Sequence, residues 1–199
     1  MSRILQRSGI WFMVCAFLAG CSSDSETPQQ ESNISLSEAR KGFKTQLVRR
    51  ENTDLPLPNP PAELFRSLRF SAPSGELLAY LTPDPGDGKK HPAIIWITGG
   101  NSSSLDDGMW KALPSGDETA SGFREAGILM MFPTLRGGSK NPGVHEGFFG
   151  EVDDVIAATD FLAKQPYVDQ DRIYLGGLSC GGTLALLNQN QIENRSFSA

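Results

Sequence analysis

A serine between glycines is the residue of this 199-residue chain whose type and setting most clearly predict chemistry. The run Gly177-Leu178-Ser179-Cys180-Gly181 has the spacing G-x-S-x-G, and it follows one apolar run and precedes another. The pattern therefore falls at a turn from a buried strand to a helix. Glycines on both sides allow a turn sharp enough to raise the hydroxyl of Ser179 above a sheet. This setting predicts a nucleophilic serine, and the alternative is a glycine-rich turn that holds an incidental serine.

Backbone amides near this serine could stabilise the negative charge that forms when it attacks a carbonyl group. The N–H of Cys180 would lie at the start of the helix, where the helix dipole adds positive potential. An earlier apolar run ends in Gly99-Gly100-Asn101, and the N–H of Gly100 or Asn101 is the second candidate donor. The alternative is that these glycines only shape a loop. The thiol of Cys180 follows the serine, so we expect a small buried side chain there and not a nucleophile.

A serine nucleophile needs a general base, and the base needs an acid that orients it. The sequence has two histidines, His91 and His145, and both precede Ser179. His91 comes just before an apolar run and should lie at the end of the sheet far from the serine. His145 lies in a loop that could approach the substrate, although a surface histidine is the simpler interpretation. Two separated histidines and a free cysteine lack metal-ligand spacing, so no metal or other cofactor is predicted.

The elements that must position this serine alternate between strand and helix. Apolar runs typical of strands covered on both faces lie at residues 93–97, 127–132 and 171–177. Residues 64–83 look like two strands around a turn, and residues 182–189 open a helix after the serine. The alternation predicts an α/β fold with a mainly parallel sheet flanked by helices. In such sheets, catalytic groups lie at the carboxyl ends of the strands.

A helix is also predicted between residues 150 and 165. Its apolar residues recur at helical spacing, whereas Asp153 and Asp154 lie elsewhere on the helical wheel.

The first 20 residues have the parts of a secretory signal peptide. Arg3 and Arg7 come first, followed at residues 10–18 by an apolar stretch too short to span a bilayer. Leu18-Ala19-Gly20-Cys21 resembles the bacterial lipobox, in which the signal is cut before a lipidated cysteine. We therefore expect residues 1–20 to be a lipoprotein signal and Cys21 to carry the lipid. The alternative is an ordinary signal peptide or buried helix with a chance cysteine.

A lipid anchor would hold the protein at a membrane without spanning it. Ser22 follows the cysteine, and by resemblance to Gram-negative lipoproteins this favours the outer membrane of the cell envelope, on its periplasmic or outer face. Residues 21–61 are polar and contain several prolines, so they predict a flexible tether before a folded part at residues 62–199. Only Cys180 would remain free, and no intrachain disulfide is expected.

Composition excludes several other classes of protein. The chain contains 21 Gly and 13 Pro without a repeat, and 39% of its residues are hydrophobic. These values argue against collagen, a coiled coil and disorder of the whole chain. The net charge of −5, without a basic stripe, argues against nucleic-acid binding.

Together, these motifs resemble the α/β-hydrolase superfamily, and most closely the bacterial serine hydrolases grouped with the prolyl oligopeptidase catalytic domain and dienelactone hydrolase. The resemblance rests on residues 133–139, 150–155 and 168–175, which lead into the serine motif. It implies that the protein hydrolyses an ester or peptide bond of a small substrate through an acyl-Ser179 intermediate. Both peptidase and esterase activity fit this resemblance.

In that superfamily, the orienting acid and the histidine follow the serine. Only 20 residues follow Ser179 here; they contain no histidine, and Glu193 is their one acid. The sequence therefore predicts the N-terminal part of an α/β-hydrolase fold with its C-terminal strands missing. Three interpretations stay open: an exported serine hydrolase, a catalytically inactive truncated remnant or binding module, and one half of a hydrolase completed by another chain. The strand before the serine should be a poorly covered edge with exposed apolar surface.

Overall fold

The computed structural model describes residues 36–47, 56–100, 103–112 and 117–192. The predicted signal peptide and the lipidation site at Cys21 lie outside the described residues. Of the predicted tether, residues 36–47 and 56–61 are described. Within the described ranges, no helix has the length and apolar character needed to cross a bilayer.

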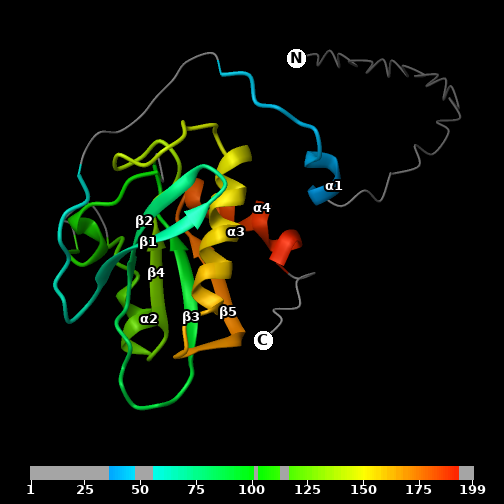
Figure 1. The fold of residues 1–199 in the computed structure, drawn as a ribbon. Coiled ribbons are helices and arrows are strands. Elements are labelled where there is room, and N and C mark those ends of the chain that lie inside the picture. The colour runs from blue at the N-terminus through cyan, green and yellow to red at the C-terminus, as the bar shows by residue number, and fades with distance from the viewer. Residues whose placement is uncertain (1–35, 48–55, 101–102, 113–116, 193–199) are drawn as a thin grey trace, which may run out of the picture. The chain divides into compact units, whose positions relative to one another are not determined.

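A twisted sheet forms the centre of the folded part (Figure 1). Its described strands follow the order β1-β2-β4-β3-β5. They comprise β1 (Arg66–Ala72), β2 (Gly75–Leu81), β3 (His91–Ile97), β4 (Leu129–Pro133) and β5 (Val168–Gly177). Strands β4, β3 and β5 run parallel, whereas β1 pairs antiparallel with β2 and β2 antiparallel with β4. The predicted α/β fold is confirmed, and the sheet is mixed because the β1–β2 hairpin joins its parallel part.

Helices cover both faces of this sheet. The described helices are α1 (Leu36–Arg40), the 3-10 helix η1 (Asp107–Met109), α2 (Ser121–Glu125), α3 (Phe149–Ala163) and α4 (Cys180–Ile192). Helices α3 and α4 pack on one face, where their apolar side chains join Phe70, Ile95 and Met131 in the larger core cluster. Helix α2 and η1 pack on the other face, around Phe65, Tyr80 and Phe132. Helix α3 was predicted from the spacing of its apolar residues, and α4 as the helix that opens after the serine.

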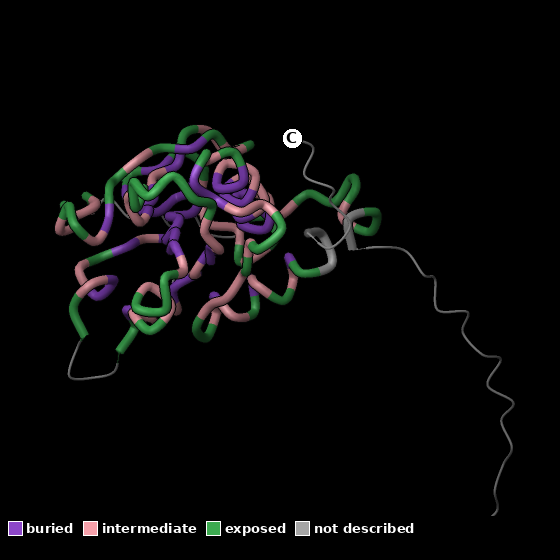
Figure 2. The backbone as a smooth tube through the Cα atoms, turned by 90° about the horizontal axis from the view of Figure 1, so that it is seen from below, coloured by how far each residue is buried: buried purple, intermediate pink, exposed green. Residues whose placement is uncertain are grey.

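The central strands are buried as their sequences predict. Every residue of β4 is buried, as are Ala93, Ile94, Ile95 and Ile97 of β3. Figure 2 shows buried residues gathered toward the inside of the folded part. Strand β5 differs: only Val168 is buried, and Tyr174 is 51% exposed. The prediction of a third buried strand was therefore wrong, because β5 forms an edge of the described sheet. The prediction of a poorly covered edge describes it correctly.

Residues 40–43, which precede the sheet in the sequence, pack against helix α3. The guanidinium of Arg40 donates to Asp153 Oδ1 at 2.9 Å and to the carbonyl oxygen of Phe149 at 2.7 Å. The ring of Phe43 stacks on that of Phe149 with centroids 4.6 Å apart. These contacts attach residues 40–43 to the first turn of α3.

Candidate active site

Ser179 lies between the end of β5 at Gly177 and the start of α4 at Cys180. Its backbone has a φ of 53°, in the left-handed region that non-glycine residues seldom adopt. Three hydrogen bonds hold the turn: Leu178 N–H to Ile97 O, Gly181 N–H to Leu178 O, and Thr183 N–H to Ser179 O, at 2.8 to 3.1 Å. The side chain is exposed. Such an unfavourable conformation costs about 1–3 kcal/mol and is typical of functional sites.

The glycines of the motif are required by how closely β3 approaches this turn. A Cβ atom on Gly177 would lie 2.7 Å from the carbonyl oxygen of Ile97, and one on Gly181 would collide with that same oxygen. Neither neighbour is a flexible side chain that could move aside. The G-x-S-x-G pattern is therefore the sequence that lets α4 begin directly against the end of β3.

The glycine loop after β3 lies beside the serine. A Cβ atom on Gly99 would lie 3.4 Å from Ser179 Cβ and 3.3 Å from the carbonyl oxygen of Leu178. Gly100 follows with a φ of 64°. The structure thus brings Gly99 and Gly100 next to the serine turn, and Cys180 begins α4 there. The third candidate donor, Asn101, lies outside the described residues.

A small pocket separates the start of α3 from the start of α4. Its volume is about 170 Å³. The lining residues are Gly100, His145, Gly147, Phe148, Glu151, Cys180 and Leu184. The residues of two candidate oxyanion donors therefore share a pocket with a histidine and a carboxylate. Cys180 is only partly buried, so its side chain is less enclosed than expected.

The two histidines lie at opposite ends of the sheet. His91 begins β3, and its Nε2 lies 3.0 Å from Asp87 Oδ1. His145 lies on the side of the serine: its Nδ1 is 2.8 Å from Glu151 Oε1 and 3.1 Å from Ser103 Oγ. Glu151 is 1% exposed, and its Oε2 has no hydrogen-bond partner among the described residues. Sequence reasoning missed Glu151, because a glutamate in the first turn of a helix is ordinarily a solvated residue.

A buried ion-pair network fixes the loop between β4 and α3. Asp154 is fully buried and accepts hydrogen bonds from the backbone N–H, Nε and Nη2 of Arg136, at 2.9 to 3.0 Å. The remaining Nη1 of Arg136 donates to Glu146 Oε1 at 2.5 Å. Burial lowers the pKa of Arg136, but Asp154 and Glu146 outweigh that effect and raise it above its usual value. This network positions the segment that carries His145.

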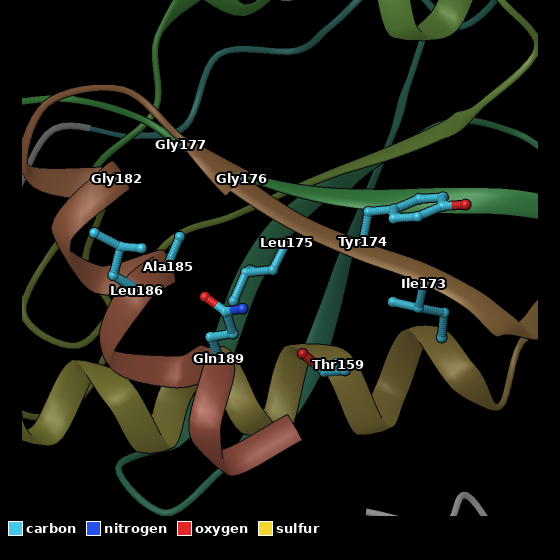
Figure 3. Close-up of a pocket in the computed structure, with 10 residues that line it drawn as sticks. All are labelled: Thr159, Ile173, Tyr174, Leu175, Gly176, Gly177, Gly182, Ala185, Leu186 and Gln189. Carbon is cyan, nitrogen blue, oxygen red and sulfur yellow. The ribbon is translucent and has the colours of Figure 1, made fainter. Parts of the chain in front are cut away.

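A larger hollow lies elsewhere, along the edge of β5 and the side of α4 (Figure 3). Its volume is about 630 Å³, and its lining includes the apolar residues Ile173, Tyr174, Leu175, Ala185 and Leu186. Neither Ser179 nor Cys180 lines it. The hollow is therefore a feature of the open sheet edge and not the cleft in which the serine would act.

No three histidine, cysteine, aspartate or glutamate side chains in the described part of the chain are grouped so that they could hold a metal ion.

The chain is similar in sequence to proteins named as peptidases. Residues 118–199 match the prolyl oligopeptidase family. Dipeptidyl-peptidase 5 of Porphyromonas gingivalis is 32% identical over 123 residues, which are 54% of this chain and 16% of that protein. A probable dipeptidyl-aminopeptidase B of Talaromyces marneffei is 27% identical over 143 residues, which are 69% of this chain and 16% of that protein. The chain thus spans about one sixth of the length of these curated relatives.

A solved structure supports the fold. The hyperthermophilic esterase of the archaeon Pyrobaculum calidifontis aligns with 68% of this chain and 42% of its own, with 20% identity and a TM-score of 0.50. This likeness shows the fold alone, whereas the predicted resemblance to the prolyl oligopeptidase family is confirmed by the sequence matches.

Proposed function

We propose that this chain carries the nucleophile of an exported, lipid-anchored serine hydrolase of the prolyl oligopeptidase type. Ser179 would attack a small ester or peptide substrate and form an acyl-serine intermediate. The observation that carries this proposal is the exposed Ser179 at a φ of 53°, between a parallel strand and the helix that begins at Cys180. A strained serine at a strand-to-helix turn is the arrangement of the nucleophile elbow.

In the proposed mechanism, Ser179 Oγ bonds to the substrate's carbonyl carbon, and the hydroxyl proton passes to a base. The N–H groups of Cys180 and Gly100 donate to the oxygen that becomes negative, and Cys180 gains from its position at the N-terminus of α4. The protonated base then gives its proton to the leaving group. Water, activated by the same base, hydrolyses the acyl-serine and regenerates the hydroxyl.

The base is the part of the reaction that this sequence leaves open. No histidine of the described chain is hydrogen-bonded to Ser179: His91 contacts Asp87, and His145 contacts Ser103 and Glu151. We place the base on a further polypeptide segment, in the same or another chain, that extends the sheet beside β5. The hollow along β5 supports this placement, because a right-handed crossover after α4 leads to that edge.

The experiment that tests the proposed function is covalent labelling of the membrane-extracted full chain by a fluorophosphonate. We expect labelling that Ser179→Ala abolishes and that Ser67→Ala, a change on the exposed face of β1, leaves intact. Labelling that survives in Ser179→Ala would place the nucleophile elsewhere. A folded chain that does not label would favour the alternative of a binding module, or of a half-site that needs a complementing chain.

Export and anchoring are proposed from the sequence pattern around Cys21. We expect cells grown with radioactive palmitate to label the wild-type chain and not Cys21→Ser, and the label to co-sediment with outer membranes. Equal incorporation into both chains would refute lipidation at this cysteine.

A further inference from the structure

The loop after β3 is clamped three residues beyond Gly100. The carbonyl oxygen of Ser103 accepts from Leu135 N–H at 3.2 Å, and Ser104 Oγ accepts from Ser139 N–H at 3.1 Å. A Cβ atom on Gly138 would collide with the Ser103 carbonyl group, so the two loops touch through their backbones. The loop after β4 therefore fixes where the loop after β3 can run.

A chain of side chains connects this clamp to helix α3. Glu151 Oε1 accepts from Glu146 N–H at 2.7 Å and lies 2.8 Å from His145 Nδ1. Ser103 Oγ lies 3.1 Å from the same nitrogen. One ring nitrogen of His145 therefore lies within contact distance of both Ser103 Oγ and Glu151 Oε1. His145 thus joins a serine that is 1% exposed to a glutamate that is also 1% exposed.

Gly100 lies between two fixed points of its loop. On one side, the carbonyl oxygen of Ile97 accepts from Leu178 N–H at 3.1 Å. On the other side is Ser103. The pocket of about 170 Å³ lies between Gly100 and His145, so close packing does not fill this space. Gly100 thus lies between the described anchors at Ile97 and Ser103 and borders the pocket that His145 lines.

We propose that Glu151, His145 and Ser103 form a positioning chain that orients the loop carrying Gly100 toward the oxygen of the substrate. The catalytic consequence rests on the proposed function, whereas the ordering of the loop does not. His145 is in this proposal a positioning residue that acts through Ser103. An oxyanion donor must be aimed correctly before the reaction, and a displacement of about 1 Å can cost about 100-fold in rate.

The test compares His145→Ala with His145→Asn in the full chain. Asn carries an amide nitrogen on Cγ, where histidine carries Nδ1, so it can still donate to Glu151 and Ser103. The matched control is His91→Asn, at the far end of β3. Two quantities are measured: hydrogen–deuterium exchange of the peptide that contains Gly99 and Gly100, and the rate at which a fluorophosphonate labels Ser179.

We expect His145→Ala to speed exchange in that peptide about tenfold, because the loop would open more often. We also expect it to slow labelling by about tenfold or more, because the oxyanion donors would be misaligned. His145→Asn should restore most of both, and His91→Asn should change neither. Unchanged exchange in His145→Ala would overturn the proposal, as would a faster exchange spread evenly over the sheet. If no variant labels while exchange responds as expected, the positioning chain stands and the proposed function fails.

Discussion

The buried pair Arg136–Asp154 offers the sharpest test of how this fold holds the loop that carries His145. Asp154 is fully buried, and its two oxygens accept three hydrogen bonds from Arg136 and one from Ser74 Oγ at 3.2 Å. The change Asp154→Asn keeps the shape of the side chain. It removes the negative charge and turns one acceptor into a donor that faces other donors.

The loss should be large because the guanidinium of Arg136 stays protonated in proteins and would remain buried without its main partner. Breaking one side of a buried ion pair typically costs about 3–5 kcal/mol. Glu146 still contacts Nη1, so we expect the lower end, about 3 kcal/mol of the free energy of unfolding. The neighbouring Asp153, whose side chain is 44% exposed and paired with Arg40, provides the matched control. Asp153→Asn should cost less than about 1 kcal/mol.

Urea unfolding followed by circular dichroism measures both changes. We expect Asp154→Asn to lower the urea midpoint with an unchanged m-value, which indicates a change of stability and not of the amount of surface exposed. Equal midpoints for the Asp154→Asn and Asp153→Asn chains would refute the reasoning, because burial would then make no difference to the cost of losing the charge.

Three further predictions concern the serine turn, the core and the open edge. Gly181→Ala should prevent the folded chain from accumulating, because the added Cβ would collide with backbone atoms at the end of β3. Gly122 has open space around it, so Gly122→Ala should leave the melting temperature equal or raise it. Equal expression yields of the two variants would contradict this prediction. Burial first, and then nearby acidic groups, raises the pKa of Tyr80. The folded state therefore favours the neutral form of Tyr80, and the free energy of unfolding should fall as pH rises above the ordinary tyrosine pKa. Thermal melts at increasing pH measure this fall, which should be smaller in Tyr80→Phe. Tyr174 and Leu186 are 51% and 70% exposed beside the β5 hollow, so a chain with both changed to lysine should associate less in sedimentation experiments. Unchanged association would show that a different surface is responsible for it.

Local sequence patterns were sufficient for the parts of the fold that depend on neighbouring residues. The apolar run at 127–132 became β4 at Leu129–Pro133, and the helical spacing at 150–165 became α3 at Phe149–Ala163. The turn at Ser179 was predictable because glycines on both sides of the serine indicate a sharp turn with closely approaching backbones. The approaching backbone, the end of β3 at Ile97, could not be identified from the spacing alone.

Contacts between distant segments were beyond the reach of these patterns. The antiparallel pairing of β2 with β4 joins residues about fifty positions apart, such as Tyr80 and Phe132, and nothing local marks it. The burial of β5 was overestimated for a related reason: its apolar residues are the same whether or not another strand lies beside it. Burial on the edge of a sheet depends on what covers that edge, and Tyr174 shows that no described segment does.

Asp153 and Asp154 show most clearly why charged site residues escape sequence reasoning. Both lie off the apolar stripe of α3, and the helical wheel treats them alike. In the structure, Asp153 is half exposed beside Arg40, whereas Asp154 is fully buried by Arg136, a residue of the loop after β4. Glu151 is buried on the same helix by the loop that carries His145. An acidic side chain can be buried in a site when a partner from another segment offsets the cost of removing its charge from water. The loops after β3 and β4 therefore define the candidate site as much as the serine turn does.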